Sequence, residues 1–178
     1  MEKEEYAIVL DYLPNGYPLE GKMMPIAQAV GEVSLVLLEL VPRKGMPLEV
    51  GEKVYIGEGK RDKVYYILGR MKKDKVTETS KENLKKFIEK IVKENEERFV
   101  NFFNKAESIN KRIHQIELLP GIGKKYVKEI INQRNIKPFG SFEDMKKRIT
   151  HLPFPERSIE RRIIQELTED ERYRLFTN

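Results

Sequence analysis

The sequence predicts an α+β protein with a small β-barrel at the N-terminus, a connecting amphipathic helix and an all-α C-terminal domain. Two observations lead to this prediction. Short runs rich in Val, Ile, Leu and Tyr fill the first 76 residues, and apolar residues recur with helical spacing after them. The predicted boundaries are 1–76, 77–106 and 107–178. A hydrophobic fraction of 39% is enough for folded cores in both domains.

The N-terminal region contains four runs with the length and composition of strands, separated by turn sequences such as Pro-Asn-Gly and Gly-Glu-Gly. Short strands at this spacing predict a small barrel or sandwich. The predicted strands are Tyr6–Leu10, Val33–Val41, Lys53–Ile56 and Val64–Leu68.

Basic residues precede and follow the fourth predicted strand, so that residues 57–76 carry a net charge of +4. They predict a groove that follows a nucleic-acid strand, lined by Arg61, Lys63, Arg70, Lys72 and Lys73. Tyr65 or Tyr66 would offer a ring for base stacking. The alternative is structural: a tyrosine in a strand usually lies in a core, and a Lys-rich hairpin protects an edge strand from aggregation.

Residues 77–106 predict one amphipathic helix. Thr79 and Glu82 form a capping-box pattern, and apolar residues follow at helical spacing from Leu84 to Phe103. A helix from about residue 80 to 104 would be roughly 37 Å long at 1.5 Å per residue. The two flanking domains would cover its apolar stripe, or a partner protein would cover the Phe99–Phe103 end.

The run Leu118-Leu119-Pro120-Gly121-Ile122-Gly123-Lys124-Lys125 lies between two stretches with helical apolar spacing. The first stretch contains Ile109, Ile113 and Ile116, and the second contains Val127, Ile130 and Ile131. This pattern predicts a helix, a tight turn and a second helix. Residues 107–150, which include both stretches, carry a net charge of +5.

The predicted turn has the features of a phosphate site. Pro120 sets the turn, and the glycines leave the backbone open to a close approach. The following helix begins with amides that have no acceptor in the helix, beside a group of lysines. The predicted phosphate-binding residues are Gly121, Ile122, Gly123, Lys124, Lys125 and Lys128. The alternative is a simple turn between helices.

The stretch from Leu119 to Lys125 resembles the core of helix-hairpin-helix modules, which bind nucleic acids: an apolar residue, Pro, Gly, an apolar residue, Gly and a basic helix start. The chain departs from that pattern at Val127, where these modules usually carry a small residue. The resemblance implies a monovalent cation, K⁺ or Na⁺, on backbone carbonyls near Leu118, Gly121 and Gly123, bridging to phosphate.

A second copy follows. Residues 137–145 are similar to the bridge that joins tandem copies in this family. Ser141 and Asp144 form an N-cap pair for a helix with Phe142, Met145 and Ile149 on one face, and a last helix aligns Ile159, Ile163 and Leu167. The turn at 152–155 reads Leu-Pro-Phe-Pro and lacks both glycines, so we expect the second hairpin to be degenerate and structural.

The whole arrangement, from Glu4 to Leu167, resembles an uncharacterised, mainly archaeal family of predicted OB-fold nucleic-acid-binding proteins with a C-terminal tandem helix-hairpin-helix domain. The resemblance implies a protein that binds nucleic acid, RNA in preference to DNA, with the ribosome or RNA-processing proteins as partners. Two alternatives stay open: a protein-interaction adaptor, and a DNA-binding accessory factor in repair or recombination.

Composition excludes several other classes. The chain has no cysteine, so it has neither disulfides nor thiolate metal sites. No apolar run is long enough for a membrane span, and the acidic start is unlike a signal peptide, so we expect a cytoplasmic protein without a membrane partner. The two histidines are isolated and no nucleophile or zinc pattern occurs, so we expect neither an enzyme nor another cofactor.

Overall fold

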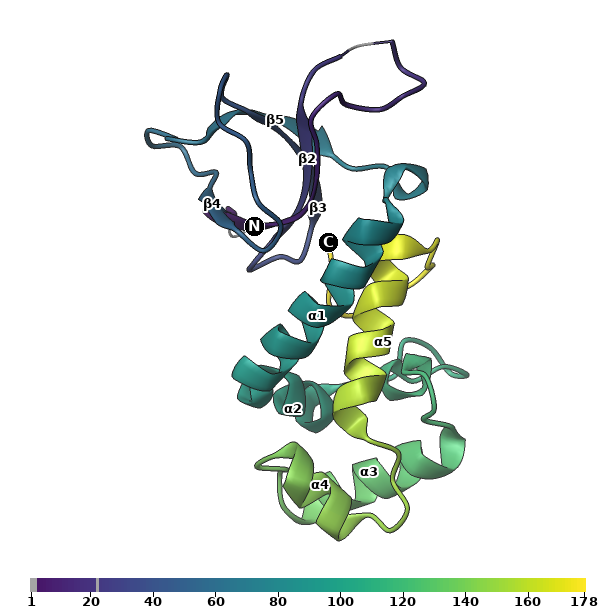
Figure 1. The fold of residues 1–178 in the computed structure, drawn as a ribbon. Coiled ribbons are helices and arrows are strands. Elements are labelled where there is room, and N and C mark those ends of the chain that lie inside the picture. Colours follow the sequence, from purple (N-terminus) through teal and green to yellow (C-terminus); the bar gives the residue numbers. More distant parts are fainter. Residues whose placement is uncertain (1–2, 22) are drawn as a thin grey trace. The chain divides into compact units, whose positions relative to one another are not determined.

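The computed structural model describes residues 3–21 and 23–178. They form an α+β fold with a single β-sheet (Figure 1). The chain divides into two compact units. The first consists of the described residues up to Lys86 together with Glu166–Asn178, and the second is Phe87–Gln165.

The first unit is built on one antiparallel sheet with the strand order β4-β1-β2-β3-β5. The sheet curls, but its edge strands β4 and β5 are not neighbours, so it forms a half-barrel that does not close (Figure 1). The predicted small β-barrel is therefore wrong. The strands are β1 (Tyr6–Leu13), β2 (Ile26–Gly31), β3 (Leu37–Pro42), β4 (Lys53–Tyr55) and β5 (Val64–Arg70).

Strand β2 is absent from the sequence prediction, which has four strands instead of five. Its sequence, Ile-Ala-Gln-Ala-Val-Gly, contains residues that are depleted in strands. All six residues are buried, so the surroundings of this strand override its weak propensity. The predicted strand over 33–41 is also too long, because residues 32–34 form a turn and β3 starts at Leu37.

The hydrophobic core of the sheet unit contains side chains from all five strands and from the segments before and after β4. The alanines of β1 and β2 are fully buried, and their small size suits the inside of a curled sheet. Tyr12 and Ile67 pack against the same cluster. The buried members are Ala7, Val9, Ala27, Ala29, Leu38, Leu40, Leu48, Val54, Ile56 and Val64.

Buried Gln28 of β2 binds the start of helix α1 (Glu78–Glu94). Its Oε1 accepts hydrogen bonds from the Thr77 amide (3.1 Å) and the Ser80 hydroxyl (2.7 Å), and its Nε2 donates to the Lys75 carbonyl (2.7 Å). The Thr77 hydroxyl accepts from the Ser80 amide (3.1 Å), so Thr77 caps the helix. The predicted capping box at Thr79 and Glu82 is therefore wrong, because the helix cap lies two residues earlier, at Thr77.

The connecting region contains two helices where the sequence predicts one. Helix α1 ends at Glu94, and α2 (Glu96–Lys105) begins after Asn95, whose φ of −117° and ψ of 39° break the helical path. The α2 side chains Phe99 and Phe103 are fully buried. The burial of these two rings within the chain leaves them no role in docking a partner protein.

The predicted separate, all-α tandem helix-hairpin-helix domain at the C-terminus is also wrong. Helices lie throughout the chain after β5, and residues 166–178 belong to the sheet unit. There the buried carboxylate of Glu166 accepts hydrogen bonds from the amides of Leu175 (2.6 Å) and Thr177 (3.0 Å). The remaining helices are η1 (Lys73–Lys75), η2 (Gln115–Leu118), α3 (Lys124–Ile136), α4 (Phe142–Arg148) and α5 (Pro155–Thr168).

No α-helix forms ahead of the Pro-Gly turn, although the spacing of Ile109, Ile113 and Ile116 predicts one. The Ile109 amide donates to the Ile113 carbonyl (2.8 Å) across a tight loop, and only the 3₁₀ turn η2 follows. The side chain of Asn110 accepts hydrogen bonds from the amides of Arg112 (2.8 Å) and Ile113 (3.0 Å). This Asx-type turn competes with helix formation.

The later helices agree with the sequence prediction. The Ser141 hydroxyl accepts from the Asp144 amide (2.9 Å) and caps α4, as expected. The predicted apolar faces of α4 and α5 are buried. In the part of the chain that the structure describes, no helix is both long and apolar enough to cross a bilayer.

Candidate nucleic-acid interface

The loop before α3 is a type II turn. The Ile122 amide donates to the Leu119 carbonyl (3.1 Å), with Pro120 and Gly121 as the central residues. Gly121 has a φ of +84°, which this turn requires at its third position and which favours glycine. Leu119 and Ile122 are buried and anchor the two sides of the turn. The turn predicted from the sequence is confirmed.

The start of α3 presents backbone amides to the outside. Gly123 is the N-cap, and it offers no side-chain acceptor. The first amide bonded within the helix is that of Val127, which donates to the Gly123 carbonyl (3.1 Å), so the amides of Lys124, Lys125 and Tyr126 have no acceptor in the helix. A Cβ atom at Gly123 would meet nothing within 4 Å. The backbone is therefore open to a ligand.

The charges at this helix start oppose the helix dipole. Helices α1, α2, α4 and α5 each have acidic residues in the first turn, whereas α3 has none and starts with Lys124 and Lys125. Both lysines are exposed. A cation at a helix N-terminus costs about 0.3–1 kcal/mol. An anion bound at this position would reverse that cost.

A basic depression of about 230 Å³ lies beside α3. Its wall combines the loop over 108–114 with the first turns of α3. Four cationic side chains line it, and within the described part of the chain none of them forms an ion pair or a hydrogen bond. These four, named here the basic cluster, are Lys111, Arg112, Lys124 and Lys128. All are exposed.

His114 in the wall of the depression is a structural cap. Its Nδ1 accepts the Ile116 amide (3.1 Å), and its own amide donates to Glu117 Oε1 (2.9 Å). Burial, followed by the nearby guanidinium of Arg134, lowers the pKa of His114. The ring is therefore neutral near pH 7, with its proton on Nε2. This geometry gives His114 the role of a cap and not that of a general base.

Helix α5 supports the turn. The Ser158 hydroxyl donates to the Pro120 carbonyl (2.7 Å), and Arg162, which is only 4% exposed, makes a long hydrogen bond to the Leu118 carbonyl (3.5 Å). A K⁺ or Na⁺ ion on the Leu118 carbonyl would lie close to this buried guanidinium, and charge repulsion disfavours that arrangement. The residues around Leu118 therefore do not fit a bound cation well.

The basic residues predicted in the sheet unit lie towards the two ends of β5. Arg61 and Lys63 precede β5, whereas Arg70, Lys72 and Lys73 lie at or beyond its end, roughly 20 Å away at about 3.3 Å per residue. Most of them also have partners inside the chain. Lys63 pairs with Glu52, Lys73 pairs with Asp170 (3.1 Å), Arg61 donates to the Gly57 carbonyl (2.7 Å) and Arg70 donates to the Asn178 carbonyl (3.3 Å).

The two tyrosines of β5 differ in exposure. Tyr65 is 63% exposed, whereas Tyr66 is partly buried. Their rings meet edge to face, with centroids 5.4 Å apart and planes at 71°. Of the two candidates, Tyr65 is therefore the ring that a ligand can reach.

Two members of the basic cluster, Lys111 and Arg112, are missing from the sequence prediction. The predicted helix over residues 109–116 would have placed their side chains away from the Pro-Gly turn. For this reason they are not among the predicted phosphate-binding residues. The signal that could have found them is the Asn110-Lys111-Arg112 sequence, in which a turn-forming asparagine precedes two cations.

Together, the fold and the site define an α+β protein with an exposed, uncompensated cationic surface at a helix start. The chain belongs to the family described as "protein of unknown function (DUF655)", which matches residues 3–178. The expectation of an uncharacterised family with archaeal members is thereby confirmed.

Two relatives match nearly the whole chain. The uncharacterized protein MJ0038 from Methanocaldococcus jannaschii is 45% identical over 175 residues, which cover 97% of this chain and 79% of that protein. The crystal structure of Af1531 from Archaeoglobus fulgidus, of the same family, has 44% sequence identity and a TM-score of 0.84. That match covers 98% of this chain and 100% of the Af1531 chain.

Proposed function

We propose that this protein binds nucleic acid without catalysis, holding the phosphate backbone at the start of α3 with little sequence specificity. The observation that carries the proposal is the basic cluster, whose four cations have no partner in the described part of the chain and lie beside the open amides of α3. Backbone amides, a helix dipole and nearby cations together favour phosphate oxygens.

The number of cations favours a polymer over a single phosphate ion. Each phosphodiester carries one negative charge, so several consecutive phosphates are needed to neutralise the cluster. The depression is open, and Glu117, the only acidic residue among those that the structure describes in its wall, is used by the His114 amide. Phosphate contacts position a strand but carry no base information, which is why we expect little sequence specificity.

We propose RNA over DNA as the ligand, and the ribosome or RNA-processing proteins as partners, because the sequence resembles a family expected to act in RNA metabolism. A cytoplasmic location is part of the same proposal. Phosphate contacts are common to RNA and DNA, so the test must compare both. A cation on the Leu118 carbonyl is disfavoured, so the proposed phosphate contacts do not include a bound K⁺ or Na⁺.

The test is fluorescence-anisotropy binding of single- and double-stranded RNA and DNA at about 50 and 200 mM salt, where phosphate-driven affinity changes strongly. Wild-type protein should bind, with an affinity that falls steeply with salt. The double substitution Lys124→Glu and Lys125→Glu should abolish this binding. It should also leave the protein folded and slightly more stable, by about 1 kcal/mol, since acidic residues suit a helix N-terminus.

A matched control is available on α1. Lys85→Glu with Lys86→Glu changes the net charge by the same amount at two adjacent exposed lysines and should leave binding unchanged. Equal affinities for the Lys124/Lys125 variant and the wild type would overturn the proposal. A duplex-DNA preference would favour the accessory factor in repair. No binding to any of the four nucleic acids would favour the protein-interaction adaptor.

A further inference from the structure

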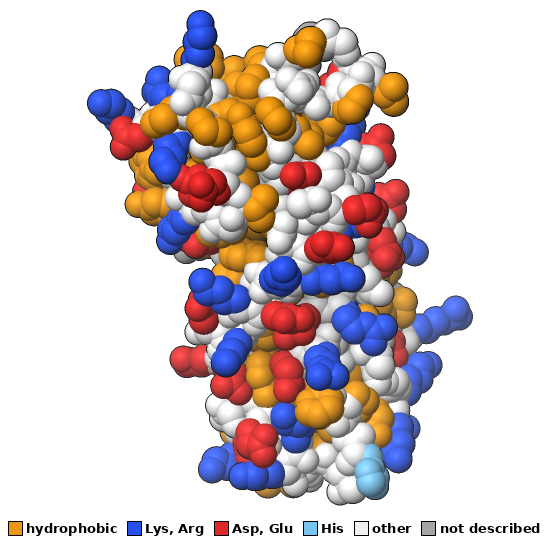
Figure 2. Space-filling view, in the orientation of Figure 1, with side chains coloured by type: hydrophobic (Ala, Val, Ile, Leu, Met, Phe, Trp, Pro, Cys, Tyr) orange, Lys and Arg blue, Asp and Glu red, His pale blue; other side chains and the backbone are white. Residues whose placement is uncertain are grey.

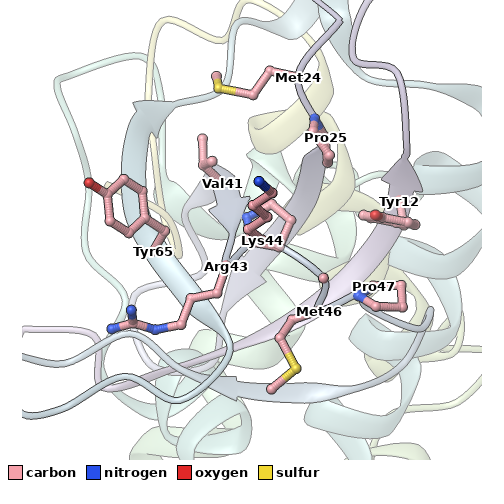
Figure 3. Close-up of a pocket in the computed structure, with 11 residues that line it drawn as sticks. Tyr12, Met24, Pro25, Val41, Arg43, Lys44, Met46, Pro47 and Tyr65 are labelled. Atoms are coloured by element: carbon pink, nitrogen blue, oxygen red, sulfur yellow. The ribbon is translucent and has the colours of Figure 1, made fainter.

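A second pocket lies in the sheet unit, where hydrophobic side chains gather at the surface (Figure 2). Its volume is about 380 Å³, within the range of sites for small organic groups. Residues of β1, β3 and β5 and two loops form it, and Figure 3 shows Tyr12 and Tyr65 on opposite sides. The methionines Met24 and Met46 also line it, and their flexible thioethers pack well against aromatic rings.

The polar side of the pocket is cationic. Arg43 and Lys44 belong to its wall, and none of the lining residues that the structure describes is Asp or Glu. Both cations are exposed. Within the described part of the chain, the Lys44 side chain has no partner. The pocket is therefore complementary to a ligand that is flat and apolar in its centre and negatively charged at its edge.

The loop that carries these cations is preformed. The Met46 amide donates to the Arg43 carbonyl (3.0 Å), with Gly45 at a φ of +76°, as in a type II turn. Arg43 is held further by its Nε, which donates to the Arg61 carbonyl (2.7 Å), and by its amide, which donates to the Lys63 carbonyl (2.8 Å). A fixed loop loses little conformational entropy when a ligand binds.

We propose that this pocket receives one unstacked base of a single-stranded nucleic acid, with the adjacent phosphate on Lys44 and Arg43. The proposal rests on the proposed function and names its ligand more closely, as an unpaired strand. An exposed aromatic ring beside Lys and Arg is the combination that holds single strands, because every base has a face that can stack. A base inside a duplex is already stacked and cannot enter.

The test compares a labelled single-stranded RNA of about ten nucleotides, a length such surfaces bind, with the same sequence as a duplex. Tyr65→Ala should weaken single-strand binding about tenfold and leave duplex binding unchanged. Tyr65→Phe, which keeps the ring, should bind like the wild type. Leu68→Ala changes another exposed residue of β5 outside the pocket and should have no effect. The melting temperature of each variant reports its folding.

Four results would overturn the proposal. Equal single-strand affinities for Tyr65→Ala and the wild type would mean that no base stacks on Tyr65. A protein would then be the better candidate for the partner of this surface. Equal losses for single strand and duplex would mean that Tyr65 does not select an unpaired base. Photo-cross-linking of a 4-thiouridine strand should label peptides that line the pocket, and labelling confined to residues 108–128 would also contradict it. Absence of all nucleic-acid binding by the wild type would overturn both proposals.

The lysines at the start of α3 distinguish a failure of the base pocket from a failure of the proposed function. The Lys124/Lys125 variant should lose single-strand and duplex binding alike, whereas Tyr65→Ala should weaken only single-strand binding. If the lysine variant behaves as expected and Tyr65→Ala does not, the base pocket is wrong and the proposed function stands.

Discussion

Gly121 and Gly123 lie two residues apart but have different backbone conformations, so the same substitution should affect them differently. Gly121 has a φ of +84°, and Gly121→Ala should lower the free energy of unfolding by about 1 kcal/mol. Gly123 has a φ of −89° and open space around its Cβ position, so Gly123→Ala should leave stability nearly unchanged. It should still weaken nucleic-acid binding, because the methyl group occupies the approach to the amides of α3.

Urea unfolding and anisotropy on the two variants measure these effects. Gly140→Ala is the control, because a Cβ atom there also meets nothing within 4 Å and the residue lies outside the Pro-Gly turn and the basic cluster. It should change neither stability nor binding. If Gly123→Ala binds like the wild type, phosphate does not approach the backbone at this position, and the side chains of the basic cluster carry the contact alone.

At the scale of single elements, the short helix η2 depends on a neutral histidine. Its N-cap, His114, accepts the Ile116 amide through Nδ1, and burial lowers the pKa of His114 below its ordinary value of 6.5. The unfolded chain therefore binds a proton more readily than the folded chain. Stability should rise with pH through this window, and the His114 contribution should be lost as the pH falls below about 6.5.

His114→Asn tests this prediction, because asparagine is also a good N-cap and does not titrate. The free energy of unfolding of the wild type should fall between about pH 7.5 and 5.5, the range in which histidine titrates, more than that of the variant. Urea unfolding at several pH values gives the comparison. Parallel pH profiles for the wild type and the variant would mean that His114 has the same proton affinity in the folded and the unfolded chain.

The elements that the sequence predicts correctly are those with strong local signals. Ser141 and the apolar spacing after it define α4, and Pro-Gly defines the turn before α3. The errors occur where a local pattern competes with another interaction. Strand β2 is stable only because its neighbours bury it, and the turn at Asn110 overrides the isoleucine spacing after it. No sequence signal shows whether β4 and β5 would meet and close the barrel.

At the scale of the whole molecule, the distribution of charge in the sequence is an incomplete guide to function. Two segments, residues 57–76 and 107–150, have similar positive net charge. In the first, most of the cations proposed to bind nucleic acid have partners in the chain, such as Glu52 for Lys63 and Asp170 for Lys73. In the second, the basic cluster has none in the described part. Pairing is decided by the fold, so it could not be predicted from the sequence.

The slope of log K against log salt, where K is the binding constant, should therefore reflect only the cations that have no partner in the chain. Each phosphate contact contributes about −0.7 to the slope of log K against log salt for a single strand. The basic cluster with Lys125, plus Lys44 where a base is bound, gives a slope of about −3 to −4. If the five basic residues predicted in the sheet unit, Arg61, Lys63, Arg70, Lys72 and Lys73, also bound phosphate, the slope would be near −7 or steeper.

Anisotropy titrations at four or more salt concentrations measure this slope. The Lys85/Lys86 control variant should keep the wild-type slope, whereas the Lys124/Lys125 variant should show no measurable binding at any of these salt concentrations. A wild-type slope near −7 would contradict the argument from pairing, because Lys63 and Lys73 would then have to leave their carboxylate partners to bind phosphate. A slope near zero would contradict phosphate binding itself.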